Sequence, residues 1–108
     1  MSMYPIEITE KAIADMQGIY DYISDILLVP ETAIAQYNRI AEAIETLSEY
    51  PERCRAFDCE PERSMGIRTL RVNNYSVIFK IQEPKVIILR VLYSASDIIE
   101  RLREKDEL

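Results

Sequence analysis

The chain has 108 residues, 48% of them apolar and 30% charged, which is typical of one folded globular domain. It carries 13 Lys and Arg against 19 Asp and Glu, a net charge of −6, and no histidine. The absence of an imidazole excludes Ser-His-Asp and Cys-His nucleophilic sites, histidine-ligated zinc and histidine general bases. Cys54 and Cys59 lack the further ligands that a closed zinc site needs, so we expect neither a metal nor a cofactor.

The sequence shows no targeting or membrane-spanning signal, and its charge is unevenly distributed. No signal-peptide segment and no run of about 18 apolar residues is present, so we expect a cytoplasmic protein with reduced thiols and no membrane partner. Residues 1–52 contain ten acidic and two basic residues, whereas residues 53–93 contain four acidic and eight basic residues. Any contact made through positive charge is therefore expected within residues 53–93.

The N-terminal third predicts a strand and a helix. Apolar and polar residues alternate over residues 4–8, which indicates a short strand. Thr9 then stands as an N-cap before a helix of about residues 10–28. Its apolar positions, spaced by three and four, are Ile13, Met16, Tyr20, Ile23 and Leu27. Gly18 costs this helix roughly 1 kcal/mol relative to alanine, which suggests a close contact with a neighbouring helix.

A second helix is expected from Pro30, because proline fits the first turn of a helix. Its apolar positions are Ala33, Tyr37, Ile40, Ile44 and Leu47. Two such helices joined by a short link predict a helical hairpin that serves as scaffold. Between Tyr50 and Gly66, two prolines and many charges predict a long surface loop, and loops of this length are more often functional than not.

The clearest local signal is a β-hairpin of residues 67–72 and 75–82 around Asn73-Asn74. A two-residue turn sets Val72 opposite Tyr75, Leu70 opposite Val77 and Arg68 opposite Phe79. The face with Leu70, Val72, Tyr75, Val77 and Phe79 is expected to pack on the helices. The other face, with Arg71 and Lys80, is expected to be charged and open.

A last strand is expected over residues 86–93 after a turn at residues 83–85. The facing of Arg90 depends on the loop, and the cost of burying an unpaired arginine favours the open side. Ser94-Ala95-Ser96-Asp97 resembles a capping box and predicts a short helix with Ile98, Ile99 and Leu102 on its apolar side. The chain is thus expected to be α+β, in the order β-α-α-β-β-β-α, with the helical hairpin on one face of a mostly antiparallel four-stranded sheet.

The order of these elements resembles the RelE/ParE superfamily of bacterial toxins, in a group that includes plasmid stabilisation proteins. The resemblance covers nearly the whole chain, so we expect a single toxin domain of residues 1–108. It is carried by the opening strand, Tyr22-Ile23, Leu47-Ser48-Glu49-Tyr50-Pro51, Gly66 to Tyr75, Val91-Leu92-Tyr93 and Asp97.

This resemblance implies the toxin of a type II toxin–antitoxin system, neutralised by a cognate antitoxin that wraps around it. Operator DNA would be bound only through the antitoxin, because this chain has no DNA-reading motif. RelE-like members cut mRNA on the ribosome with basic residues, and sometimes a tyrosine or histidine, on the open sheet face. ParE-like members inhibit DNA gyrase without cleaving nucleic acid.

If the chain is a ribonuclease, Tyr93, Arg71 and Arg90 are its candidate catalytic residues. Cleavage at a 2′-hydroxyl needs a proton acceptor and cations beside the phosphate, and Tyr93 stands where the family commonly has histidine or tyrosine. Two departures reduce the positive charge. Ser76 and the segment of residues 94–96 replace positions that often hold arginine in nuclease members.

Arg53, Arg55, Arg68 and Lys80 are the candidate target-binding residues. Each also has a structural interpretation: Arg53 and Arg55 offset acids of the loop, Arg68 pairs with a carboxylate, and Lys80 is a solvated strand residue. Tyr93 likewise has an interpretation as a packing residue.

The absence of histidine, the missing arginines and the acidity of the chain together favour a protein target over RNA. A net charge of −6 opposes approach to RNA, so we expect a ParE-like toxin that binds a protein target such as DNA gyrase. The alternatives are a ribosome-dependent endoribonuclease with a reduced basic site and a toxin-derived binding module without activity.

Overall fold

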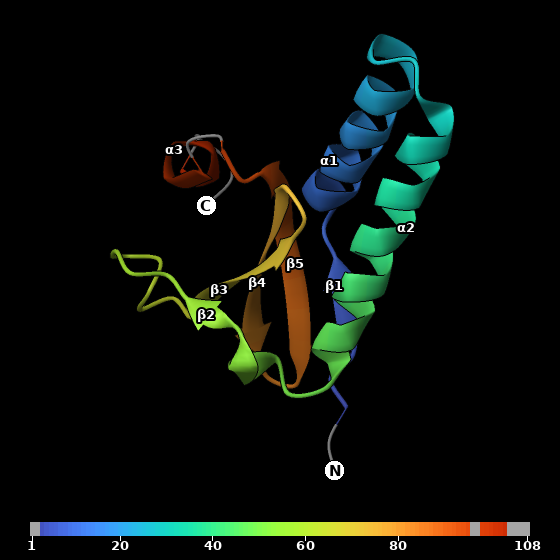
Figure 1. Ribbon diagram of the computed structural model, residues 1–108. Helices are drawn as coiled ribbons and strands as arrows, with labels where there is room; N and C mark the ends of the chain where they lie inside the picture. Colours follow the sequence, from blue (N-terminus) through green and yellow to red (C-terminus); the bar gives the residue numbers. More distant parts are fainter. Residues whose placement is uncertain (1–2, 96–97, 104–108) are drawn as a thin grey trace.

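The computed structural model describes residues 3–95 and 98–103, which form an α+β fold with helices on both sides of one sheet (Figure 1). The sheet order is β1-β5-β4-β3-β2, with β1 parallel to β5 and the other pairs antiparallel. Its strands are β1 (Ile6–Ile8), β2 (Arg55–Ala56), β3 (Ile67–Val72), β4 (Tyr75–Gln82) and β5 (Lys85–Tyr93). The helices are α1 (Glu10–Asp21), α2 (Pro30–Glu45) and α3 (Ile98–Leu102). The predicted fold class is confirmed, with β2 as a fifth strand.

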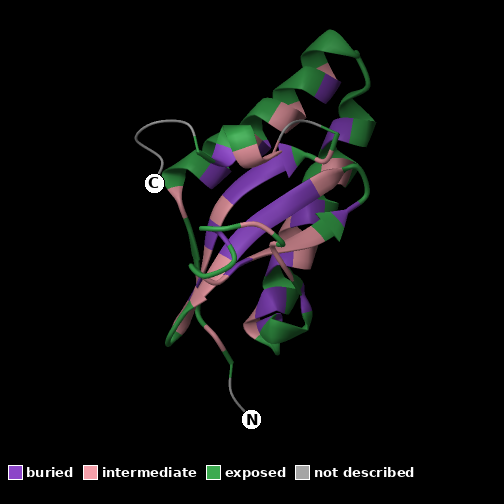
Figure 2. Ribbon diagram, turned by 90° about the vertical axis from the view of Figure 1, so that its left-hand side faces the viewer, coloured by how far each residue is buried: buried purple, intermediate pink, exposed green. Residues whose placement is uncertain are grey.

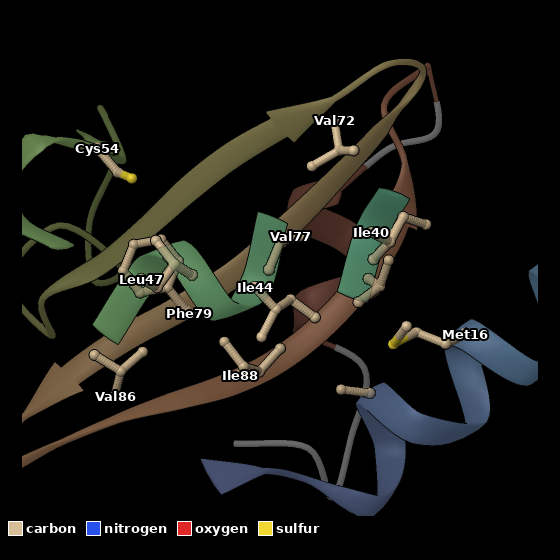
Figure 3. Close-up of a cluster of buried hydrophobic side chains, with 12 residues drawn as sticks. Met16, Ile40, Ile44, Leu47, Cys54, Val72, Val77, Phe79, Val86 and Ile88 are labelled. Carbon is tan, nitrogen blue, oxygen red and sulfur yellow. The ribbon is translucent and has the colours of Figure 1, made fainter. Parts of the chain in front are cut away.

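The main core lies between the sheet and the helical hairpin of α1 and α2. Figure 3 shows its side chains from both layers, among them Met16, Ile40, Ile44, Leu47, Val77, Phe79, Val86 and Ile88. Phe79 at the centre has no exposed surface. Because the central strands bury one face against two helices, this layer supplies most of the hydrophobic stabilisation.

The first predicted helix forms, but its buried side differs from the one expected. α1 continues through a π-helical turn, Tyr22–Ile26, and Met16 and Ile23 are buried as predicted. Ile13 and Leu27 were wrongly assigned to the core, since they are 54% and 52% exposed. The helix is rotated so that small Ala12 faces the sheet, and alanine contributes too little to a search for large apolar residues.

The start of α1 is bound to the sheet, which sets this rotation. The Thr9 side chain accepts a hydrogen bond from the Ala12 backbone N–H, as an N-cap does. Its hydroxyl lies 2.9 Å from the Ile88 carbonyl of β5. The predicted start of α2 at Pro30 is confirmed, and Ala33, Ile40, Ile44 and Leu47 are buried as expected. Tyr37, also expected on the buried side, is 38% exposed.

Residues 51–66 are not the open loop that the prolines and charges predict. Pro51–Arg53 form a 3-10 turn, and β2 pairs with β3 at the edge of the sheet. Glu62 is completely buried, where both its carboxylate oxygens accept from Arg103, at 2.7 and 2.8 Å. The segment is thus held by backbone pairing and by an ion pair across 41 residues, which local composition does not reveal.

The β-hairpin is confirmed with its register, including Val72 opposite Tyr75 and Arg68 opposite Phe79. The expectation of an open second face is wrong. Ile67 and Ile78 on that face form a second buried cluster with Leu102 of α3. Figure 1 shows α3 on the side of the sheet away from α1 and α2. Although this helix is short, it covers the second face of the β-hairpin.

Arg90 lies opposite Ile78, beside a register shift between Ile78 and Phe79, and is only 5% exposed. The expectation of an open position is therefore wrong. It was based on the cost of burying an unpaired arginine, whereas Arg90 is paired with Asp15 of α1.

The predicted short helix is present as α3, with Leu102 buried. Residues 96–97 of the proposed capping box lie outside the described residues. Across residues 3–95 and 98–103, no helix has the length and apolar character needed to cross a membrane.

Candidate functional site

A pocket of about 670 Å³ lies between α1 and the ends of β4 and β5 next to the β-hairpin turn. The helix side is formed by Ala14, Gly18 and Tyr22, spaced four residues apart and therefore on one face. Tyr75 and Tyr93 form the sheet side. A concave site lined by aromatic residues and a few polar groups is the usual form of a binding pocket.

Tyrosines make up the rim of this pocket. Tyr75 and Tyr93 are directly opposite in the sheet, with ring centroids 5.8 Å apart and an interplanar angle of 63°. Burial raises the pKa of Tyr75, and the nearby hydroxyls of Tyr93 and Tyr22 raise it further. Tyr75 is therefore uncharged at neutral pH, and the rim presents aromatic surface together with hydroxyl groups.

Gly18 keeps the helix side of the pocket open. A Cβ at this position would meet no heavy atom within 4 Å, so the expected close contact with another helix is wrong. The glycine instead leaves space that a side chain would fill. Gly18 and Tyr93 both stand out in the sequence, but nothing in the sequence places them in one pocket.

A buried ion pair supports the wall of the pocket. Arg90 Nε lies 2.7 Å from Asp15 Oδ2, Arg90 Nη2 lies 3.0 Å from Asp15 Oδ1, and the Val91 backbone N–H also donates to Asp15 Oδ2. The guanidinium is thereby neutralised inside the protein. Asp15 was missed at the sequence level, because no local pattern relates it to Arg90, which lies 75 residues away in the chain.

Arg53 and Arg68 are hydrogen-bonded to the chain itself. Arg53 Nη1 donates to the Glu49 carbonyl at 2.9 Å, and Arg53 Nη2 donates to Thr46 Oγ1 at 2.9 Å. These bonds hold the turn that follows α2. Arg68 Nη1 donates to the Cys54 carbonyl at 2.7 Å. Both guanidiniums thus bind the connection between α2 and the sheet.

The remaining basic candidates lie apart from one another. Arg55 pairs with Asp58 at 3.1 Å on the surface, and Arg71 Nε donates to the Asn73 carbonyl at 2.8 Å in the β-hairpin turn. Lys80 is half-buried and forms no ion pair with the described part of the chain. Of the seven residues proposed from sequence, only Tyr93 lines the pocket, and Arg90 lies behind its wall.

Ser76 and Ser94 lie side by side at the end of the sheet. Their hydroxyl oxygens are 2.8 Å apart, and Ser76 is buried. The pair joins β4 to the segment after β5. These are two positions that the resemblance associates with arginine in nucleases, and here they form a neutral contact.

The chain is similar to toxins of type II toxin–antitoxin systems, both in sequence and in structure. Residues 6–98 match the family model described as the ParE toxin of the type II toxin–antitoxin system, parDE. The chromosomal ParDE system of Pseudomonas aeruginosa contains a similar structure, with a TM-score of 0.71 and 29% identity over 84% of this chain and 96% of that one.

The RelBE2 toxin–antitoxin complex of Mycobacterium tuberculosis also contains the fold. Its TM-score is 0.62, with 23% identity over 89% of this chain and 97% of the other. A search of curated protein sequences found no match.

Proposed function

Since the chain belongs to the ParE family of type II toxins, we propose that it stops growth by binding a protein target, DNA gyrase being the first candidate. A cognate antitoxin is proposed as its neutralising partner, because the similar structures come from toxin–antitoxin systems. The observation that supports protein binding is that most of the candidate basic residues already form hydrogen bonds within the chain. Five of the six proposed from sequence donate to acceptors of the chain itself.

Ribonuclease chemistry would require cations directed at a phosphate beside the reacting hydroxyl. Tyr93 is half-exposed, and Arg101 is the one basic residue that lines its pocket in the described part of the chain. Arg90, three residues before Tyr93, donates to both carboxylate oxygens of Asp15. Arg71 binds its own turn. Ser76 and Ser94, which stand where the nucleases often have arginine, form a neutral contact and supply no positive charge. This arrangement favours protein binding over RNA cleavage.

The pocket supports the same proposal. Its tyrosine rim offers large, rigid surfaces with polar ends, which is the kind of surface enriched where proteins bind one another. A net charge of −6 also disfavours approach to the ribosomal RNA.

The proposal is tested by expressing the chain in bacteria without an antitoxin and following growth, plasmid supercoiling and mRNA integrity in one culture. We expect arrest with altered supercoiling and intact mRNA, and inhibition of purified gyrase by the purified chain. Tyr93→Phe is the matched variant, because it removes one hydroxyl and keeps the ring.

Retained arrest in Tyr93→Phe would support protein binding. Ribosome-dependent mRNA cuts that disappear with this variant would overturn the proposal in favour of an endoribonuclease. Normal growth with folded protein would instead favour the binding module without activity.

A further inference from the structure

The turn between α1 and α2 exposes an unusual amount of apolar surface. Its members, named here the hairpin-tip surface, are Tyr22, Ile26, Leu27 and Leu28. Ile26 is 65% and Leu28 76% exposed. Figure 2 shows this end of the molecule as largely exposed. Tyr22 and Leu27 also line the pocket, so the hairpin-tip surface and the pocket are continuous.

The backbone presents these side chains in an uncommon way. The first helix ends in a π-helical turn, Tyr22–Ile26, a conformation frequent at functional sites. Leu28 follows with φ +61°, in the left-handed region that glycine and asparagine adopt more readily than leucine. The strained residue directs a leucine side chain into solvent, where it adds nothing to the core.

The helices beside this surface carry charge of one sign, whereas Arg101 lines the pocket. Residues 12–38 contain four acids, Asp15, Asp21, Asp25 and Glu31, and neither lysine nor arginine. Asp15 is neutralised by Arg90. Asp25 and Glu31 form no ion pair with any residue that the structure describes. An apolar surface with negative flanks is complementary to apolar residues flanked by positive ones.

We propose that the hairpin-tip surface and the pocket together bind an amphipathic helix of the growth-inhibition target, with lysines or arginines beside its apolar face. This inference rests on the proposed function. One large apolar side chain of the helix enters the pocket next to Gly18, and another, three or four residues away, packs on Leu27 and Leu28. The basic flanks of the helix meet Asp25 and Glu31.

The first test is a titration with two synthetic helices of about 18 residues, or five turns. Both carry the same leucine face with a central tryptophan, and their polar faces are lysine in one and glutamate in the other. The chain contains no tryptophan, so fluorescence reports the peptide alone. We expect a blue shift with the basic peptide and at least about tenfold weaker binding of the acidic one.

Variants locate the binding site. Gly18→Leu fills the pocket at a position with room for a side chain and is expected to weaken binding of the basic peptide about tenfold, the effect of losing a central contact. Leu28→Ser tests the hairpin-tip surface. Met65→Ser, which changes an exposed apolar residue outside both regions, is the matched control and is expected to bind normally.

Equal binding of the two peptides, or wild-type binding by Gly18→Leu with its fold verified by circular dichroism, would overturn the inference. So would a concentration-dependent dimer that Leu28→Ser disrupts, since the surface would then be occupied by a second copy.

Growth assays link the surface to the target. Gly18→Leu and Leu28→Ser are expected to reduce growth arrest, whereas Met65→Ser is not. Peptide binding as expected together with full arrest by Gly18→Leu would contradict the assignment of the surface to the target. A wild-type chain that leaves growth unimpaired would overturn the proposed function alone, because the peptide titration would still decide the docking surface.

Discussion

Asp15 and Arg90 are 75 residues apart in the chain, yet both oxygens of the Asp15 carboxylate accept from the Arg90 guanidinium inside the protein. The pair joins α1 to β5 next to the pocket. Its two side chains are only 13% and 5% exposed, so either charge would be poorly hydrated if the other were removed.

Breaking this pair is predicted to destabilise the fold strongly. Asp15→Leu or Arg90→Met should each lower the free energy of unfolding by about 3–5 kcal/mol, because each removes one half of a buried ion pair. Replacing both with apolar residues, Asp15→Leu and Arg90→Met, should recover much of the loss. Urea unfolding of the single and double variants measures this. Additive losses would show that the two side chains act independently.

Glu62 is predicted to make stability dependent on acid pH. Its hydrogen bond with Arg103 lowers the pKa of the buried carboxyl from 4.5 to about 2. A lowered folded-state pKa means that the ionised form stabilises the fold above about pH 4.5 and that this contribution is lost as the pH falls towards 2.

The thermal midpoint measured between pH 6 and pH 2.5 should therefore fall less steeply in Glu62→Gln than in the wild type. Asp58→Asn, which removes a surface-exposed partner of Arg55, is the control and should leave the slope unchanged. Parallel curves for Glu62→Gln and wild type would refute the role of this pair.

Gly18→Ala is predicted to stabilise the protein by roughly 1 kcal/mol, because alanine is the better residue inside a helix and its methyl group meets no neighbour. Gly66→Ala should do the opposite, since Gly66 has φ +80°, where a Cβ causes strain. Both changes are measured by urea unfolding. Destabilisation by Gly18→Ala would mean that the helix needs its glycine for a contact absent from the structure.

Leu28→Asn is predicted to separate stability from function. Asparagine tolerates the left-handed backbone of residue 28 better than leucine, so the free energy of unfolding should rise or stay equal. Growth arrest should nevertheless weaken, because the exposed leucine is lost. Chemical unfolding and growth of the same variant check this, and a stabilised variant with full toxicity would count against the docking role of Leu28.

The elements with local signals could be predicted from the sequence alone. The β-hairpin register follows from two residues, Asn73 and Asn74, because a two-residue turn sets every opposite pair, and α2 follows from Pro30 and its apolar spacing. The family resemblance was also carried by the order of such elements along the chain.

What the sequence could not supply depends on contacts between distant segments. The burial of Arg90 requires Asp15, and the covering of Ile67 and Ile78 requires Leu102, none of which local periodicity relates. The pocket exists only because Gly18 of α1 and Tyr93 of β5 meet across the fold. The pattern of charged and apolar residues indicates which side chains need a partner. Tertiary packing determines that partner, because it brings distant segments of the chain into contact.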